Sequence, residues 1–282
     1  MIVKTYAAPY CSSDVGALVA AAVLRPSTAI DRLPPLQAEP SPIAERAQEQ
    51  HAILVRTLRD RGVTVTEIAP QSESQTESLL ADCALLLRNG AVIARPAQLE
   101  RRGEVAAVEK HLVDLGIPVV GRIEAPGLLD ASDVVVGADR IFVGVPRSGV
   151  GLRPRSNELG RKQLEAIATE QGYRSVELPI ASDVPRLRSV FNLVAADTAI
   201  AAPEKVDLVA AGGLKIVEVP RGEEFAAGVL AFGDRRVIAN LRFRESVALL
   251  RKAKITVESI DLWEFGKAGY GPFSLVLAVK RA

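Results

Sequence analysis

The stretch ALLLRNGAVIARP, residues 84–96, contains the pattern that decides the fold of this chain. Two apolar runs, residues 84–87 and 91–94, flank an Arg-Asn-Gly turn at residues 88–90. Asn-Gly is among the strongest short signals for a β-hairpin, because both turn positions tolerate a positive φ angle. The stretch therefore predicts two antiparallel strands joined by a tight turn.

The same pattern recurs three more times along the chain, which predicts a fold made of repeats. The further hairpins are expected at residues 134–145, 190–201 and 229–239. A helical segment and then another apolar strand follow each hairpin. The helices are expected at residues 101–115, 156–171, 204–211 and 242–254, and the strands after them at residues 118–121, 175–178, 215–219 and 255–259. Each repeat is thus an antiparallel hairpin, a helix and a third strand.

A fifth unit has a helix and a strand but no hairpin of its own. Ser41 is a good N-cap and Pro42 suits the first helical position, so a helix is expected from there to about Asp60. The strand of this unit is expected at residues 63–68.

The two ends of the chain can supply the missing hairpin together. An N-terminal apolar run leads into a strand near residues 22–25, and a C-terminal strand is expected at residues 274–279. Five units would then close into a ring, and radial repetition of this kind leaves few sheet edges exposed. Because no linker rich in Pro, Gly or Ser divides the chain, the sequence predicts a single α/β domain over residues 1–282. Its fold is expected to be a five-bladed propeller of ββαβ-type repeats.

The composition excludes several classes of function. The chain has 282 residues, with 35 Lys and Arg against 34 Asp and Glu, and 4% of it is aromatic. A protein that binds nucleic acid normally carries a basic excess, so no nucleic-acid partner is expected. The two Cys and two His are too few for a disulfide framework or a Cys-rich zinc site, and no metal or cofactor is predicted.

The longest apolar run near the N-terminus, residues 15–24, has ten residues and is too short to span a membrane. A transmembrane helix needs roughly 20 apolar residues. Asp14 directly precedes the run and only Lys4 supplies positive charge upstream, which is unlike a signal peptide. A cytoplasmic protein with reduced thiols is therefore expected.

Four segments of the chain resemble the pentein superfamily, and most closely the dimethylarginine dimethylaminohydrolases within it. The first hairpin, with RRGEV at residues 101–105, is similar to the family's first hairpin and helix. LDASDV at residues 129–134 is similar to its Leu-Asp-Gly-Gly-Asp-Val strand, and RSN at residues 155–157 is similar to its Arg-Thr-Asn loop. RLRSV at residues 186–190 stands where the family has His-Leu-Lys-Ser-Val. The resemblance covers nearly the whole chain and implies a five-bladed α/β propeller with its active site at the centre.

The resemblance implies a chemistry whose central residues are replaced in this sequence. Family members cleave a guanidinium carbon–nitrogen bond with a Cys nucleophile near the C-terminus, a His as acid and base, and carboxylates that hold the cation. The His position falls at Arg186, and an Arg cannot exchange a proton near neutral pH. The Cys position falls at Phe273 or Ser274, neither of which is a thiol. No catalytic residue of the family type is therefore predicted.

Some of the acidic residues of the family are also replaced in this sequence. Asp82 matches one of them, but its acidic neighbour is replaced by Ala81. An acid further upstream falls at Thr76, or at Glu77 if the register slips by one. The set of carboxylates that would hold a guanidinium is therefore incomplete.

The two Cys and two His of the chain do not replace the missing pair. Cys83 is expected to be a buried small apolar residue, and Cys11, which could be exposed, has no neighbour in sequence that would activate it. His51 falls on an apolar helical stripe and is expected in the core, whereas His111 is expected at a partly solvated helix flank.

The resemblance also brings several arginines toward one cavity. Arg101 and Arg155 match residues that hold the α-carboxylate of the substrate, and Arg186 would face the same cavity with Arg188 nearby. Bidentate Arg side chains recognise carboxylates well, so the site is expected to favour anions. The alternative is that these arginines only pair with central acids such as Asp130, as a structural ion network.

Three functional hypotheses follow. The leading one is a protein that binds a small amino-acid-like carboxylate, with or without a guanidino group, and lacks the family's hydrolysis. The second is a carbon–nitrogen hydrolase that uses Ser274 as nucleophile or Asp130 as base. The third is a propeller that serves as a scaffold for a partner, and a homodimer is compatible with the sequence. The residues assigned to ligand binding are Asp82, Arg101, Asp130, Arg155, Arg186 and Ser274.

Overall fold

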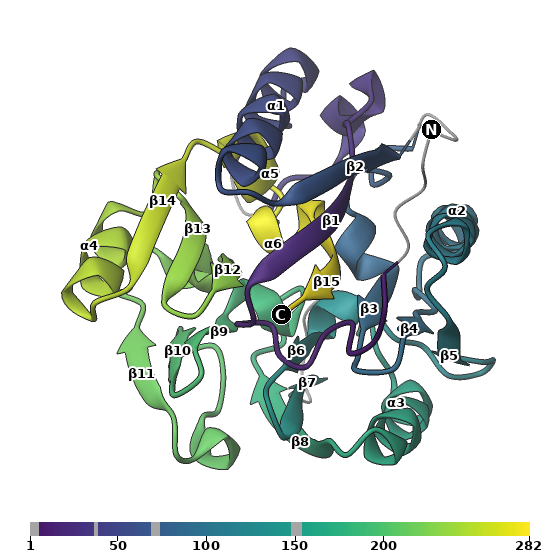
Figure 1. The fold of residues 1–282 in the computed structure, drawn as a ribbon. Helices are drawn as coiled ribbons and strands as arrows, with labels where there is room; N and C mark the ends of the chain where they lie inside the picture. Colours follow the sequence, from purple (N-terminus) through teal and green to yellow (C-terminus); the bar gives the residue numbers. More distant parts are fainter. Residues whose placement is uncertain (1–5, 37–38, 69–73, 148–153) are drawn as a thin grey trace.

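The computed structural model describes residues 6–36, 39–68, 74–147 and 154–282. Their strands form five sheets of three strands each, arranged around a common centre (Figure 1). In each sheet one strand pairs antiparallel with the middle strand, and the middle strand pairs parallel with the third. The five-bladed α/β propeller that the repeats predict is therefore confirmed.

Four blades each use strands that follow one another along the chain, and all four predicted hairpins are present. The first two blades are β3 (Ala84–Leu86), β4 (Ala91–Ile93) and β5 (Val119–Arg122), then β6 (Val134–Val136), β7 (Arg140–Pro146) and β8 (Arg174–Ile180). The next two are β9 (Phe191–Ala195), β10 (Thr198–Ala201) and β11 (Lys215–Glu218), then β12 (Leu230–Gly233), β13 (Arg236–Asn240) and β14 (Thr256–Ile260).

The fifth blade joins the two ends of the chain. It consists of β15 (Leu277–Arg281), β1 (Leu18–Leu24) and β2 (Thr64–Ile68). β15 runs antiparallel to β1, with Leu18 opposite Arg281, and β1 pairs in parallel with β2. The pairing of the ends closes the ring as the sequence predicts.

Four longer helices lie outside the sheets, each between the second and third strands of a blade (Figure 1). They are α1 (Ala44–Asp60), α2 (Arg102–Asp114), α3 (Glu158–Glu170) and α4 (Arg244–Lys252). In α1 the buried stripe includes Ala47, Leu54 and Leu58, which share one face at the helical period. Gly62 follows α1 with a φ of +82°, a left-handed conformation that a residue without a Cβ adopts easily. Glycines with positive φ follow α2 and α3 in the same way.

The prediction of a helix over residues 204–211 is wrong. A short 3₁₀ turn, η6 (Val209–Ala211), forms only at the end of this segment. Val206 instead makes an antiparallel bridge with Ile180 of β8, and the N–H of Asp207 donates to the same strand at 2.8 Å. Backbone groups that a helix would use for itself are thus bonded to the neighbouring blade.

The start of α1 also differs from the prediction. The helix begins at Ala44 with Ile43 as its N-cap, rather than at Pro42 after Ser41. The N–H of Ile43 donates to Glu264 Oε2 at 2.8 Å, so an acid from a distant segment caps this helix. A serine side chain is therefore not needed at its start.

Two further residues lie in other elements than expected. Asn157, not Ser156, is the N-cap of α3, and its Oδ1 accepts the N–H of Gly160 at 2.9 Å. Ser274 lies in a short helix, α6 (Pro272–Leu275), and not in the C-terminal strand, which starts three residues later.

A short helix precedes the innermost strand of every blade. These helices are η2 (Leu80–Asp82), η4 (Ala131–Asp133), η5 (Leu187–Ser189), η7 (Glu224–Ala227) and α6. η2 contacts both α6 and η4, and η5 contacts both η4 and η7. Gly271 lies against the end of η7, because a Cβ on it would stand 2.1 Å from the carbonyl oxygen of Gly228. Side chains from all five blades therefore meet at the centre of the propeller.

The apolar core lies largely between neighbouring blades. Phe142 of β7 meets Phe191 of β9 edge to face, with ring centroids 5.1 Å apart, within a cluster of aliphatic side chains. In the part of the chain that the structure describes, no helix has the length and apolar character needed to cross a membrane.

Candidate functional site

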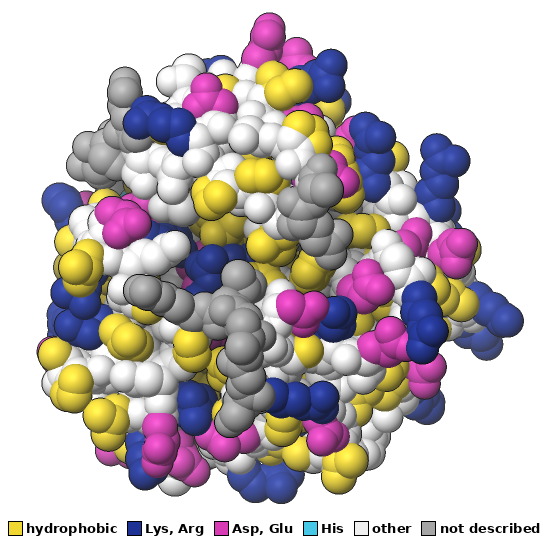
Figure 2. Space-filling view, turned by 180° about the vertical axis from the view of Figure 1, so that it is seen from behind, with side chains coloured by type: hydrophobic (Ala, Val, Ile, Leu, Met, Phe, Trp, Pro, Cys, Tyr) yellow, Lys and Arg dark blue, Asp and Glu magenta, His cyan; other side chains and the backbone are white. Residues whose placement is uncertain are grey.

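A pocket of about 650 Å³ lies where loops of several blades meet at one face of the propeller. Figure 2 shows a hollow near the middle of one face, with basic side chains inside it. The residues that line the pocket include Leu36, Thr76, Leu99, Arg155, Pro185 and Tyr270. Its volume is in the range of pockets that hold small molecules.

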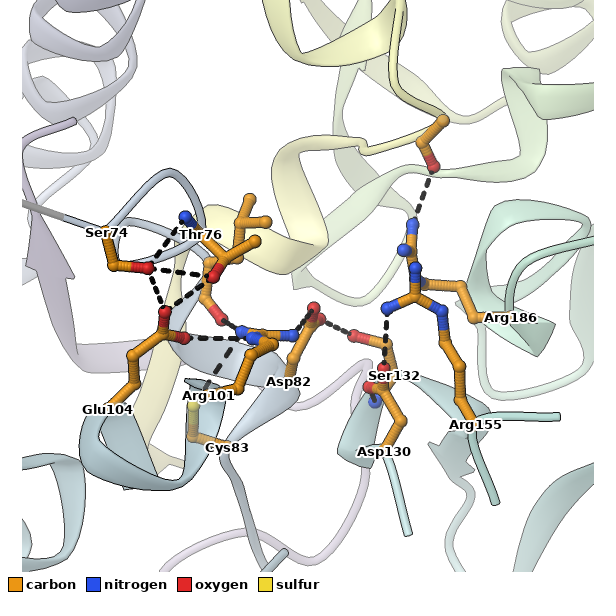
Figure 3. Close-up of polar contacts among 12 residues, drawn as sticks. Ser74, Thr76, Asp82, Cys83, Arg101, Glu104, Asp130, Ser132, Arg155 and Arg186 are labelled. Atoms are coloured by element: carbon orange, nitrogen blue, oxygen red, sulfur yellow. Dashed lines mark hydrogen bonds and ion pairs between the residues drawn. The ribbon is translucent and has the colours of Figure 1, made fainter. Parts of the chain in front are cut away.

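Arg101 lies at the centre with every nitrogen of its guanidinium occupied (Figure 3). Nε donates to Glu104 Oε2 at 2.9 Å, Nη1 donates to Asp82 Oδ2 at 2.8 Å, and Nη2 donates to the carbonyl oxygen of Leu79 at 3.1 Å. Its side chain has no exposed surface. These contacts agree with the hypothesis that Arg101 belongs to a structural ion network, since each of its three nitrogens already donates to a group of the protein.

Asp82 joins this ion pair to the next blade. Its Oδ1 accepts a short hydrogen bond from the hydroxyl of Ser132 in η4. Burial acts to raise the pKa of Asp82, but the charges of Arg101 and Arg186 outweigh burial and hold the pKa below its usual range. Asp82 is therefore ionised and forms part of the structural network.

Asp130 and Asp133 are two further buried acids at the start and end of η4. Asp130 Oδ1 accepts the N–H of Ser132 at 2.9 Å, and burial together with the charge of Asp82 raises the pKa of Asp130. Asp133 accepts the hydroxyl of Ser156 at 2.6 Å and the N–H of Leu187 at 3.1 Å. Burial and the charge of Asp130 raise the pKa of Asp133 to about 7, so this acid changes its charge near neutral pH.

Arg155 lies between these acids and the pocket. Its Nη1 is 3.4 Å from Asp130 Oδ2, a long contact for an ion pair, and 22% of its side chain is exposed. It also lines the pocket. Arg155 is therefore placed to meet a ligand that enters there.

Arg186 is as buried as Arg101 but differs in its contacts. Its Nη1 donates to the carbonyl oxygen of Gly269 at 3.0 Å, and its guanidinium carbon lies 3.8 Å from the ring centroid of Tyr270. Nε and Nη2 have no hydrogen-bond partner among the described residues. Figure 3 shows the guanidinium of Arg186 turned toward that of Arg155. The charges of both arginines act to lower the pKa values of Asp82 and Asp130.

The two candidates for the nucleophile position, Phe273 and Ser274, are both buried. The ring of Phe273 packs against Gly228. The N–H of Ser274 donates to the carbonyl oxygen of Gly271 at 3.1 Å, but its hydroxyl makes no hydrogen bond with any residue that the structure describes. Among the described residues, no base is hydrogen-bonded to this hydroxyl, as the activation of a Ser nucleophile would require.

Arg188, expected near the central cavity, is held elsewhere. It donates to the carbonyl oxygen of Val134 at 2.7 Å and to Asn192 Oδ1 at 3.2 Å, and it forms a short ion pair with Asp14. These contacts make Arg188 part of the packing between blades rather than of the pocket.

Of the two Cys and two His residues, Cys83 lies near the centre, where Arg101 Nη2 is 3.8 Å from its Sγ. Cys83 is buried as expected and Cys11 is buried as well, and burial raises the pKa of each thiol to about 12. Burial lowers the pKa of His51, on α1, to about 4. His111 lies on α2, at the outside of its blade. Within residues 6–36, 39–68, 74–147 and 154–282, no group of three or more His, Cys, Asp or Glu is arranged to hold a metal ion.

The sequence analysis did not assign three residues that contact the central arginines and acids: Glu104, Ser132 and Tyr270. Glu104 follows Arg101 by three positions on a predicted helix, and this spacing would have predicted their ion pair. Tyr270 and Ser132 gave no such signal, because their partners belong to other blades.

No family model matches the chain. It is 30% identical over 221 residues to an N(G),N(G)-dimethylarginine dimethylaminohydrolase of Streptomyces coelicolor. The matched region covers 78% of this chain and 81% of the relative. A second protein of that name, from Pseudomonas aeruginosa, is 28% identical over 227 residues, covering 77% of this chain and 83% of the relative.

Solved structures share the fold. A mutant of the Pseudomonas aeruginosa enzyme complexed with citrulline has a TM-score of 0.81 and 24% identity, and the match covers 93% of this chain and 99% of that chain. An amidinotransferase of saxitoxin biosynthesis from Microseira wollei has a TM-score of 0.78 and 16% identity, covering 96% of this chain and 97% of the other.

Proposed function

The chain belongs to the dimethylarginine dimethylaminohydrolase family of the pentein superfamily, and from this premise we propose that it binds a small amino-acid-like carboxylate without the Cys- and His-based hydrolysis of the family. The observation that carries the proposal is Arg155, a permanent cation that lines the pocket and is only loosely paired with Asp130. A partly exposed guanidinium is well suited to a carboxylate.

The absence of the family's hydrolysis is supported by what stands at the centre. Arg186 takes the place that the resemblance gives to the His, and it cannot give or take a proton near neutral pH. Cys11 and Cys83 are buried, and a thiol with a pKa of about 12 is almost wholly protonated at pH 7. Neither thiol therefore offers the nucleophile that the reaction needs.

The two rival functions have less support. A hydrolase that uses Ser274 needs a base beside the hydroxyl, and no described residue bonds to it. A pure scaffold would fit an apolar or blocked centre, whereas the pocket here is lined by Arg155, which contacts the buried Asp130. Binding of a small polar ligand accounts better for these features.

Calorimetry on the full chain tests the proposal with arginine, methylated arginines, citrulline and succinate. Binding of at least one of these at millimolar concentration or below is expected. Arg155→Gln should weaken that binding at least tenfold, whereas Arg221→Gln, a matched change at an arginine that is 86% exposed, should not alter it. If none of the four kinds of compound binds, the proposal is wrong.

A parallel assay addresses the reaction itself. Citrulline, ornithine and ammonia are measured after incubation of the same protein with arginine and methylated arginines. No release above the buffer control is expected. Release that disappears in Ser274→Ala would instead support the hydrolase.

A further inference from the structure

Arg186 has one edge of its guanidinium free inside the protein. Nη1 is anchored to the carbonyl oxygen of Gly269 at 3.0 Å, and one face of the group is covered by the ring of Tyr270. Nε and Nη2 have no hydrogen-bond partner among the described residues, although the side chain has no exposed surface. A buried donor without an acceptor is unfavourable, so this arrangement calls for a partner beyond the residues that the structure describes.

The two unpaired nitrogens are not a random pair. The N–H bonds of Nε and of the nearer Nη hydrogen lie on the same edge of the guanidinium and point in the same direction. Their separation matches the two oxygens of a carboxylate, which can accept both bonds at once. The anchor at Gly269 and the stacking on Tyr270 fix the plane and direction of this edge before any ligand arrives.

We infer that the Nε–Nη2 edge of Arg186 binds a carboxylate of the ligand, and that a second acidic group of the same ligand meets Arg155, so that the ligand is a small dicarboxylate. The inference rests on the proposed function, because it takes the pocket beside Arg155 as the entrance. Arg186 itself does not line the pocket, but its chain neighbour Pro185 and the ring that covers its guanidinium, Tyr270, both do.

Arg101 has no share in this recognition. Two acids and a carbonyl oxygen already occupy its three nitrogens. The resemblance implies that Arg101 and Arg155 bind the carboxylate of the ligand. Under this inference Arg155 keeps that role, and Arg186 takes the role of Arg101.

The fixed charge of Arg186 also disfavours a cationic group in its place. A guanidino or amino group beside Nε and Nη2 would add a like charge and would bring further donors rather than acceptors. Arginine and methylated arginines are thus expected to bind more weakly than a compact dicarboxylate.

The test is a cycle of two ligands and two proteins, measured by calorimetry. Succinate is compared with monomethyl succinate, on the wild-type protein and on Arg186→Lys, which keeps the charge but cannot form two parallel hydrogen bonds. Wild type should bind succinate at least tenfold more tightly than the ester. In Arg186→Lys this preference should fall at least fivefold, because the partner of the second carboxylate is impaired.

Arg188→Lys is the matched control, since Arg188 lies two residues away and is held by Asp14 and Val134 outside the pocket lining. It should retain the wild-type preference. Thermal unfolding checks that each variant is folded. Arg186→His, whose planar ring can still stack on Tyr270, serves as a second variant and should lose the preference as well.

The outcomes separate the two proposals. If no carboxylate binds wild type, the proposed function fails and this inference fails with it. If succinate binds but folded Arg186→Lys and Arg186→His keep its preference over the ester, only the inference is overturned. The same holds if arginine binds wild type more tightly than succinate.

Discussion

Arg101 and Arg186 are two arginines of the same propeller centre, and both are fully buried, yet they are built in opposite ways. Arg101 lies between Asp82 and Glu104 and has a partner for each nitrogen. Arg186 has one carbonyl oxygen and one aromatic ring, and two of its nitrogens have no partner among the described residues. Burial alone therefore does not distinguish a structural arginine from one that can bind a ligand. The distinction is whether the N–H donors of the guanidinium already have acceptors within the protein.

The largest effect is expected at Arg101. Arg101→Met would leave Asp82 and Glu104 buried without their cation, and breaking a buried ion pair from one side costs about 3–5 kcal/mol of unfolding free energy. Urea unfolding of this variant against wild type measures the loss, with Arg221→Met as the surface control. A loss no larger than that of the control would remove the structural role of Arg101.

The next effect is a pH dependence that originates at Asp133. Its pKa is about 7 in the folded protein, above the ordinary Asp pKa of 3.8, so the folded state binds more protons than the unfolded state between these values. Its contribution to stability is therefore present at low pH and is lost as the pH rises through about 7. Between pH 5 and pH 7 the loss should be about 1–3 kcal/mol.

Asp133→Asn removes the pH-dependent contribution of Asp133 to stability, because the Asn side chain does not ionise. Urea unfolding at pH 5 and pH 7 should show a smaller fall in stability for the variant than for wild type. Asp82 acts in the opposite direction, since its lowered pKa gives stability that is lost on acidification, and it is present in both proteins. An unchanged pH profile in Asp133→Asn would contradict the raised pKa of Asp133.

A smaller effect is expected for Arg186→Met. The variant loses one hydrogen bond to Gly269 and the stacking on Tyr270, but it leaves no acid in direct ion-pair contact without a partner. The loss of unfolding free energy should be about 1–2 kcal/mol, clearly below that of Arg101→Met. Equal losses in the two variants, measured side by side in urea, would erase the contrast between the two arginines.

The smallest effect is expected at Ser274. Its buried hydroxyl makes no hydrogen bond with the described residues, so Ser274→Ala removes an unpaired polar group. Stability in urea should change by no more than about 1 kcal/mol and can rise. Succinate affinity, determined in parallel, should stay close to that of wild type. A loss of more than 2 kcal/mol would mean that this hydroxyl does have a partner.

The sequence by itself determined the repeats and hence the fold. Short apolar runs and a turn such as Asn89-Gly90 predict each hairpin, and these signals depend only on neighbouring residues. Glycines such as Gly62 end helices for the same local reason. The helix expected at residues 204–211 failed because Val206 pairs with the neighbouring blade, a contact that no local pattern contains.

The roles of the central arginines were decided only by the tertiary structure. Arg101 and Arg186 are the same residue type, and the resemblance placed both in one cavity. Asp82 lies 19 positions from Arg101, and Gly269 lies 83 positions from Arg186, so their partners come together only when the blades close into a ring. Which donors of a buried guanidinium are satisfied depends on these distant groups. For that reason the sequence could name the residues of the centre, but not which of them is free to bind.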